Sequence, residues 1–362
     1  MKLVDRYLIS QFFRNLALVL GSLLAIYLLI DFFERVDSFL AADLGMGVAI
    51  NYLLLKIPVI LEQIMPICLL LAGIITLGLL NRNHEMMALQ AAGLNTRRII
   101  RPLLLAALAS TLLILAMSQW LLPPTMAETN RIWHEQVRQQ SARGIERHGR
   151  VYYRGTEGLY SFLPSESEAD QAELLDFSYL TRDADFHLTA LLTAEKATWD
   201  GQLWTLRNGQ VKSGIQGGRD FRSEIFTQRQ MELPEGPTDF FLPPYALAER
   251  SLSALWRQAR AETASPRRQE ARLELHKRTS YIFLGLPLLL TGIPLLLLMH
   301  RGRGRDLALA IPAAAFLAFI TWGLWSIAQA MAGAAYLPPA LAAWLIHLLA
   351  GGLGWYFIGR NG

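Results

Sequence analysis

The sequence RNHEMMALQAAGLNTRR, Arg82–Arg98, separates two long apolar runs, Ile64–Leu80 and Leu103–Met117. It is too polar to stay in lipid and too short to form a domain. It therefore predicts one short helix that lies across the ends of two membrane spans. Such a unit of span, short helix and span can pass force from a soluble protein into a membrane.

The spacing within this stretch predicts a helix that a partner can contact. Asn83 suits the N-cap, Glu85 suits the positive start of a helix, and Gly93 suits its C-terminal end. At about 100° per residue, Met86, Leu89 and Gly93 share one face. Small and flexible apolar residues let another protein approach closely. A plain polar turn between two helices is the alternative interpretation.

Six apolar runs are long enough to cross a bilayer as helices, which takes about 20 residues each. The chain has 362 residues, and 52% of them are hydrophobic, a share too high for one soluble domain of this size. The runs are Phe12–Phe33, Tyr52–Leu80, Ile99–Leu122, Ser280–Met299, Leu307–Met331 and Tyr336–Ile358. A long polar block separates the third run from the fourth. The first run ends in charge without a convincing cleavage site, so we expect it to be a retained span.

The formal charge of +4 is distributed unevenly along the chain. Thr125–Arg278 carries 21 Lys and Arg against 22 Asp and Glu, whereas the remainder carries 13 against 8. The excess lies in alternate loops, at Lys2, Arg6, Arg82, Arg97, Arg98, Arg101, Arg301, Arg303, Arg305 and Arg360. By the positive-inside rule these loops and both termini face the cytoplasm, and the polar block lies outside. Membrane topology thus explains the basic composition, and no nucleic-acid partner is expected.

The motifs of common enzyme classes do not occur in this sequence. The P-loop pattern GxxxxGK[ST] and even the dipeptide Gly-Lys are missing, so the chain does not bind ATP through a P-loop. His84 and Glu85 are not followed by the second His of a zinc-protease motif, and there is no GxSxG. Cys68 is the one cysteine, so no intrachain disulfide can form. We expect no catalytic residue, no metal site and no cofactor in this chain.

The polar block has the period-two pattern of β-strands. The candidate strands are Arg150–Arg154, Leu159–Leu163, Glu173–Leu180, Phe186–Ala197, Gln202–Arg207, Gln210–Lys212 and Ser223–Leu233. Asp200-Gly201 and Asn208-Gly209 are hairpin-turn signals. Seven short strands with no helices between them predict a β-sandwich or jelly roll.

The predicted fold class is an α-helical membrane protein with six transmembrane helices and an inserted periplasmic all-β, jelly-roll-like domain. Residues 1–124 would form transmembrane helices 1–3, with the short helix at 83–93. Residues 125–265 would form the β domain, and residues 266–362 transmembrane helices 4–6.

Several short motifs occur in a fixed order along nearly the whole chain. They are Asp5-Arg6-Tyr7, Glu34-Arg35-Val36-Asp37, Pro58 with Pro66, Glu85–Gly93, the Trp199 and Trp204 hairpin, Glu274–Arg278 and Gly292-Ile293-Pro294. In this order and topology they resemble the LptF/LptG family, permease subunits of the lipopolysaccharide-export ABC transporter. The start and the Arg-Val-Asp segment are more similar to LptG than to LptF.

The resemblance implies a place in the bacterial inner membrane and a set of partners. These are a homologous permease subunit in a heterodimer, a cytoplasmic ATPase dimer that binds ATP and Mg²⁺, and a periplasmic jelly-roll bridge protein. Lipopolysaccharide would enter sideways between the permease subunits and pass to the bridge. The permease itself would be non-catalytic.

The resemblance also implies three kinds of site. The short helix would be the coupling helix, with its ATPase contact at Arg82, Glu85, Met86, Leu89 and Gly93. A lateral gate would lie along Leu23, Ile26, Ile30 and Phe33 of the first span and Phe316 and Ile320 of the fifth. Relatives carry lysines near the outer end of the first span, where this chain has Asp31. We therefore expect Arg35 and Lys56 to contact the lipid headgroup instead.

Two other functions fit the same layout. A permease or mechanotransmission subunit for another lipid or a lipoprotein would differ only in the residues that contact the lipid. A secondary transporter would need no ATPase partner, but internal inverted repeats, which many such transporters have, are not evident.

Overall fold

The computed structural model describes residues 3–138, 144–147, 150–164, 173–182, 188–201, 203–214, 222–236, 240, 247–260, 266–299 and 306–360. The chain forms two compact units. One is helical and joins Met1–Val137 to Leu247–Gly362, and the other is the β unit, Arg138–Ala246. Arg301, Arg303 and Arg305 lie outside the described residues.

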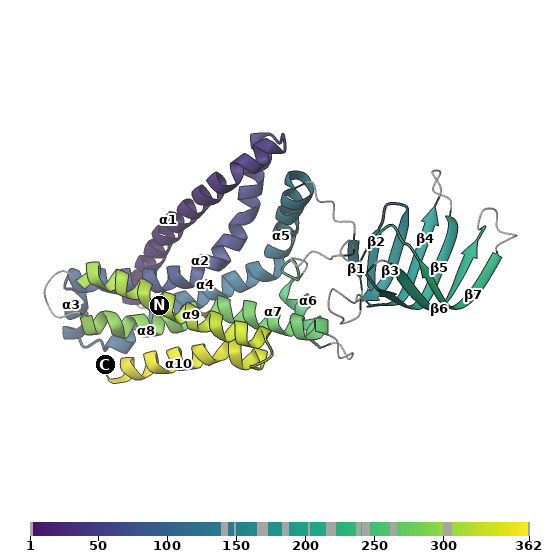
Figure 1. Ribbon diagram of the computed structural model, residues 1–362. Helices are drawn as coiled ribbons and strands as arrows, with labels where there is room; N and C mark the ends of the chain where they lie inside the picture. Colours follow the sequence, from purple (N-terminus) through teal and green to yellow (C-terminus); the bar gives the residue numbers. More distant parts are fainter. Residues whose placement is uncertain are drawn as a thin grey trace. The chain divides into compact units, whose positions relative to one another are not determined.

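The helical unit confirms the six predicted spans (Figure 1). Helices long and apolar enough to cross a membrane are α1 (Leu3–Ala41), α2 (Met46–Arg82), α4 (Thr96–Trp120), α7 (Pro266–Phe283) continued by α8 (Gly285–Met299), α9 (Asp306–Gly333) and α10 (Pro339–Arg360). The shorter elements are α3 (Glu85–Ala91), α5 (Leu122–Arg131), the π-helix η1 (Ile132–Val137) and α6 (Leu252–Ala259).

Helix α2 is the centre of the helical unit, since it packs against α1, α8 and α9. Its contact with α8 depends on small residues that let the two backbones approach closely. A Cβ atom added at Gly73 would lie 2.1 Å from Cδ1 of Leu289, and one at Gly292 would lie 2.3 Å from Cδ1 of Leu70. A larger residue at either glycine would therefore require the facing leucine side chain to move.

The β unit confirms that an all-β domain is inserted between the third and fourth spans. Its sheet contains β1 (Gly144–Arg147), β2 (Arg150–Arg154), β3 (Gly158–Pro164), β4 (Glu173–Arg182), β5 (Leu188–Trp199), β6 (Trp204–Ser213) and β7 (Arg222–Met231). The strands are antiparallel and lie side by side in chain order, with β1 and β7 at the edges. The described strands thus form one meander, without the crossed connections of a jelly roll or a second sheet.

One face of the sheet carries an aromatic core. Phe240 lies against the rings of Tyr153, Tyr160, Phe162 and Trp204, with ring centroids 5.0–5.9 Å apart. These four side chains are almost completely buried. A residue from the segment after β7 therefore closes the core that β2, β3 and β6 leave open.

Glu235 fixes this returning segment to the sheet. Its carboxylate is buried and accepts hydrogen bonds from the backbone N–H of Thr156 and the hydroxyl of Tyr160. Its carbonyl accepts a 3.0 Å bond from the indole N–H of Trp204. Burial and the bond to Glu235 raise the pKa of Tyr160, so the phenol keeps the proton that it donates.

The two predicted hairpin turns have different outcomes. Asp200-Gly201 does connect β5 to β6, with Trp199 opposite Trp204 and Gly201 at a φ of 102°. Asn208-Gly209 is not a turn, because β6 continues through it. The prediction failed because Asn tolerates a positive φ, here 49°, inside a strand as well as in a turn, and β6 keeps one register with β5 and β7 across this residue.

Four neighbouring strands change their in–out alternation at the same level. Side chains on one face of a strand are an even number of residues apart. Core residues are instead an odd number apart in β4 (Leu174, Phe177), β5 (Ala194, Ala197), β6 (Leu206, Val211) and β7 (Phe226, Met231). Each strand therefore holds one extra outward residue.

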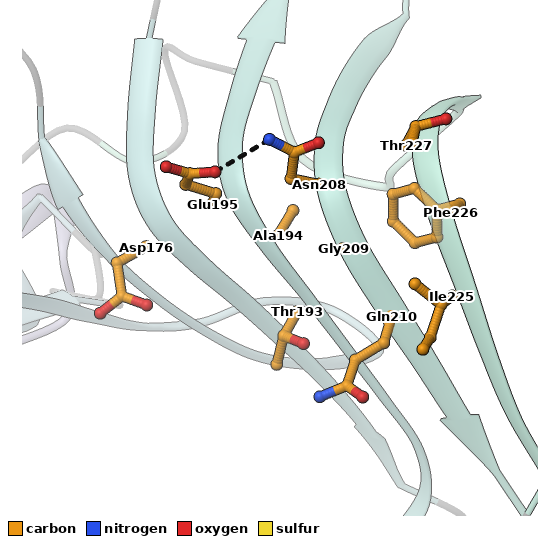
Figure 2. A pocket seen from close by; sticks show the side chains of 10 residues that line it. All are labelled: Asp176, Thr193, Ala194, Glu195, Asn208, Gly209, Gln210, Ile225, Phe226 and Thr227. Carbon is orange, nitrogen blue, oxygen red and sulfur yellow. Dashed lines mark hydrogen bonds between the residues drawn. The ribbon is translucent and has the colours of Figure 1, made fainter.

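The outward residues at this level are Asp176, Glu195, Asn208 and Thr227, which line a shallow groove across the sheet (Figure 2). Asn208 donates a 3.0 Å bond to Glu195, and the guanidinium of Arg150 bonds the side chain and the carbonyl of Asp176. These bonds satisfy polar groups that the interrupted alternation leaves exposed.

The unit boundaries differ from the predicted boundaries at 125 and 265. Residues 125–137 and 247–260 belong to the helical unit, where Ile132 packs with Phe39 and Tyr52 and Leu255 packs with Ala271. The polarity of both segments placed them with the β domain in the sequence interpretation, but their apolar faces are buried on the spans.

The aromatic core makes a testable prediction for the β unit. Trp204 is fully buried, so Trp204→Ala should destabilise this unit by about 3–5 kcal/mol. Limited proteolysis of the full-length protein in detergent should then cleave within residues 138–246 much faster. Ile225→Ala is the matched control because this β7 side chain is 82% exposed. Equal cleavage rates for the two variants would contradict the packing described here.

Candidate functional site

A buried carboxylate organises the far end of α1. Asp31 is 5% exposed, and its Oδ1 accepts hydrogen bonds from Nζ of Lys56 on α2 at 2.5 Å and from Nε of Arg35 at 3.0 Å. Its Oδ2 has no hydrogen-bond partner among the described residues. Two cations thus share one anion, and these three side chains have a formal net charge of +1, although the carboxylate of Glu34 also acts electrostatically on Lys56.

Aromatic rings surround the two cations. The guanidinium of Arg35 lies 4.1 Å from the ring centroid of Trp133 and 5.6 Å from that of Tyr52. Lys56 also lies over the ring of Tyr52. Phe39 packs against the rings of Tyr52 and Trp133. Cation–π contacts of this kind attract the cations to the ring faces. The cluster therefore joins α1, α2 and the π-helix η1.

The structure brings together the two residues predicted to contact a headgroup. Arg35 and Lys56 share Asp31 and are not free cations; their side chains are 27% and 15% exposed. The prediction did not include Trp133 or Tyr52. Their sequence signal is weak, because single aromatic residues near the ends of spans are common.

The short helix α3 forms where it was predicted, with one correction at its start. Its N-cap is His84, at a φ of 63°, and Asn83 caps the end of α2 instead. Gly93 has a φ of 84°, and the backbone N–H groups of Gly93 and Leu94 bond the carbonyls of Gln90 and Leu89. That pair of bonds is a Schellman motif, which confirms Gly93 as the end of the helix.

The predicted contact face of α3 points into the protein. Met86 is 4% exposed and belongs to the core of the helical unit, and Leu89 packs against that core. Both residues share a face as expected, but the turn at His84 aims that face inward. Met87, at 66% exposed, Ala88 and Ala91 are outside instead.

The two polar residues predicted in this region remain accessible to a partner. Arg82 is exposed and Glu85 is partly buried. Glu85 already accepts hydrogen bonds from the hydroxyl of Tyr7 at 2.8 Å and from the amide of Asn83 at 3.2 Å.

The predicted gate residues lie mostly on surfaces that no other part of the described chain covers. Ile26, Ile30, Phe33, Phe316 and Ile320 are between 43% and 65% exposed. Leu23 differs, since it packs against the core of the helical unit. The exposed stripes fit either lipid or a second chain, and the gate itself stays a prediction.

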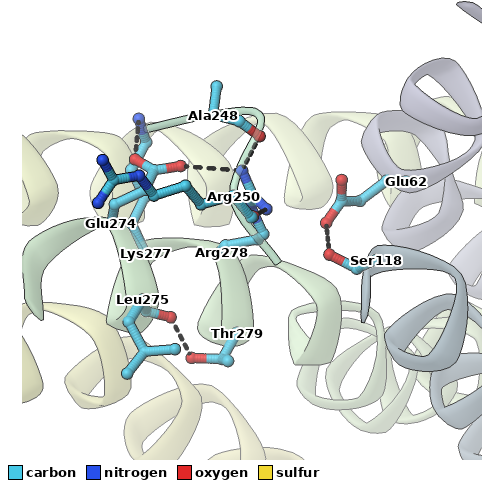
Figure 3. Close-up of polar contacts among 9 residues, drawn as sticks. All are labelled: Glu62, Ser118, Ala248, Arg250, Glu274, Leu275, Lys277, Arg278 and Thr279. Carbon is cyan, nitrogen blue, oxygen red and sulfur yellow. Dashed lines mark hydrogen bonds and ion pairs between the residues drawn. The ribbon is translucent and has the colours of Figure 1, made fainter. Parts of the chain in front are cut away.

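A buried cation connects the segment before α6 to α7. Arg278 is 7% exposed and donates to the carbonyls of Ala248 at 2.6 Å and Arg250 at 2.8 Å, beside the carboxylate of Glu274 (Figure 3). On the neighbouring helices, Ser118 donates to Glu62 at 3.0 Å. Arg278 thereby holds the segment that leads into α6, a role that the sequence interpretation did not assign.

An apolar cavity of about 320 Å³ lies among α2, α7, α8 and α9. Its lining includes Pro66, Ile67, Leu288, Phe319 and Trp322. Phe319 and Trp322 are also exposed on the outside of α9, so the cavity lies beside the membrane-facing surface. An alkyl chain matches its chemistry. Among the described residues, no group of three His, Cys, Asp or Glu side chains can hold a metal ion.

Comparison with protein families gives one match. The family described as "Lipopolysaccharide export system permease LptF/LptG" matches residues 6–360, nearly the whole chain. A comparison with curated proteins found no match.

The shared carboxylate of Asp31 makes a testable prediction. Lys56→Met should destabilise the protein by about 3 kcal/mol, the lower end of the cost of breaking a buried ion pair, because Arg35 still contacts Asp31. Adding Asp31→Leu should recover most of this loss, since it removes the buried carboxylate and leaves only Arg35, whose side chain is 27% exposed and lies over the ring of Trp133. Thermal unfolding of the full chain in detergent measures both. Asp37→Asn, at an exposed position of α1, is the control. If Lys56→Met and the double variant lowered the midpoint of thermal unfolding equally, the shared pairing would be refuted.

Proposed function

Because the chain belongs to the LptF/LptG family of lipopolysaccharide-export permeases, we propose that it is the membrane-spanning subunit of an ABC transporter that extracts lipopolysaccharide from the inner membrane. The observation that carries this proposal is the match over residues 6–360, which includes all six spans and the inserted sheet. The sister subunit is a homologous permease.

The energy comes from a separate ATPase, since this sequence has no P-loop. The exposed side of α3 is the contact, with Arg82, Met87, Ala88 and Ala91 toward the ATPase. Basic residues around α3 support a cytoplasmic position for this end by the positive-inside rule. The far end of α1 and the β unit then face the periplasm.

The cluster of Asp31, Arg35 and Lys56 receives a phosphate of the lipid headgroup. Arg35 offers a planar fork of donors suited to phosphate, and Lys56 offers a point charge. The exposed stripes of α1 and α9 form the lateral gate with the sister subunit, and the apolar cavity accommodates part of an acyl chain. The net charge of +1 of the cluster supports this assignment.

The β unit passes the lipid to a periplasmic bridge protein through an edge of its sheet. Unpaired backbone groups at an edge can pair with a strand of another protein. The edges are β1 and β7, and β7 is the longer, with 10 residues against 4. Arg150–Arg154 is the inner strand β2, because it pairs with β1 on one side and with β3 on the other.

A reconstituted complex tests the proposed function. The chain should co-purify from native membranes with an ATPase and with bound lipopolysaccharide. In vesicles the complex should transfer lipopolysaccharide to a soluble acceptor with ATP but not with ADP, and should leave phospholipid behind. Transfer that continues without the ATPase would instead indicate a secondary transporter. Preferential transfer of another lipid or of a lipoprotein would show that the substrate is not lipopolysaccharide.

The edge assignment makes a separate prediction. A photo-crosslinking residue in place of Ile225, which is 82% exposed on β7, should trap a periplasmic partner in cells. The same residue in place of Tyr152, which is 44% exposed on the inner strand β2, should trap much less. Equal trapping at both positions would argue against pairing at the β7 edge.

A further inference from the structure

The first turns of α1 are tied to the two elements that follow α2. The hydroxyl of Tyr7 donates to Oε2 of Glu85, the first residue of α3, at 2.8 Å. Nη2 of Arg98, in the first turn of α4, lies 2.8 Å from Oδ2 of Asp5. These contacts join residues that are 78 and 93 positions apart in the chain.

The two contacts hold α1 from different sides. Asp5 and Tyr7 are two residues apart, so they project about 200° apart around the helix axis. Leu8 is completely buried in the core that also contains Met86. The start of α1 is thus fixed to α3 and α4 by an ion pair, a hydrogen bond and apolar packing.

Helix α3 depends on such contacts for its position. It has seven residues, and isolated helices shorter than about 12–15 residues are marginal in water. Its contacts are the bond from Tyr7 to Glu85, the burial of Met86, and a 3.2 Å bond from Gln90 to Thr96 at the start of α4. A force that displaces α3 therefore acts directly on α1.

Helix α1 is continuous from Leu3 to Ala41. The distance along it from Tyr7 to Asp31 is about 36 Å at 1.5 Å per residue. A continuous hydrogen-bonded helix moves largely as one body over such a length. A displacement at Tyr7 thus reaches the cluster of Asp31, Arg35 and Lys56 and the exposed stripe before it.

We propose that Asp5 and Tyr7 are positioning residues that transmit the movement of α3 to α1, so that ATP hydrolysis on the partner opens the lipid path at the far end of α1. This inference rests on the proposed function. It assigns Glu85 an intrachain role, as the acceptor for Tyr7, in addition to any contact with the ATPase.

The test separates ATP hydrolysis from lipid transfer in the assembled complex. Tyr7→Phe removes only the hydroxyl, and Asp5→Asn removes only the charge. With both changes, the lipid transferred per ATP should fall about tenfold, since one change removes a hydrogen bond to a carboxylate and the other removes the charge of an ion pair. The ATPase rate and the amount of assembled complex should stay within about twofold of wild type. Tyr356→Phe, at an exposed position near the end of α10, is the matched control and should transfer lipid normally.

A charge exchange checks that the pairing itself matters. Asp5→Arg alone should lower transfer per ATP, and Asp5→Arg with Arg98→Asp should restore much of it. The inference is overturned if the Tyr7→Phe, Asp5→Asn variant transfers as much lipid per ATP as the wild type. It is also overturned if this variant loses ATPase rate, assembly and lipid transfer in parallel. If the wild-type complex itself shows no ATP-driven transfer, the proposed function falls and the inference falls with it. The two failures are distinguishable, because a wrong inference leaves the ATP-driven transfer by the wild-type complex intact.

Discussion

A chain that crosses hydrocarbon must satisfy its backbone hydrogen bonds internally, and the rest of this structure depends on that constraint. It makes every span a helix and moves charged side chains toward the span ends, where burial costs less. The polar clusters follow this rule: Tyr7 with Glu85 lies near the start of α1, and Asp31 with Lys56 lies about 36 Å further along it. That separation slightly exceeds the ~30 Å hydrocarbon thickness of a bilayer. One helix thus carries both clusters.

Much of the fold could be predicted because its signals are local. Six apolar runs specify six spans, and the hairpin at Asp200-Gly201 follows from turn chemistry between two strands. The sheet was predicted less well. The strand β1 has only four residues, too few for a periodic pattern, and it is this strand that makes β2 an inner one. Asn can adopt the positive φ of residue 208 within a strand as well as in a turn, so only the pairing partners decide between the two.

The candidate sites were predicted as residue types and not as arrangements. Arg35 and Lys56 were selected as substitutes for the lysines that the resemblance implies near the outer end of the first span. Their common partner Asp31 and the ring of Trp133 come from other turns and helices, and no local pattern relates them. The direction of Met86 was likewise set by a single left-handed residue, His84, which rotates α3 toward the core. The sequence therefore did not predict the contacts between segments that are distant in the chain.

The aligned extra residues of β4–β7 limit how this sheet can evolve. Asp176, Glu195, Asn208 and Thr227 lie at one level, and beyond that level every strand has exchanged its inner and outer faces. Deleting one of them would turn half of that strand inside out relative to its neighbours, and would place Phe177 or Leu206 in solvent. Single-residue insertions and deletions should thus be rare here among related proteins. Changes of length would have to arise in all four strands together, so the four extra residues are inherited as a unit.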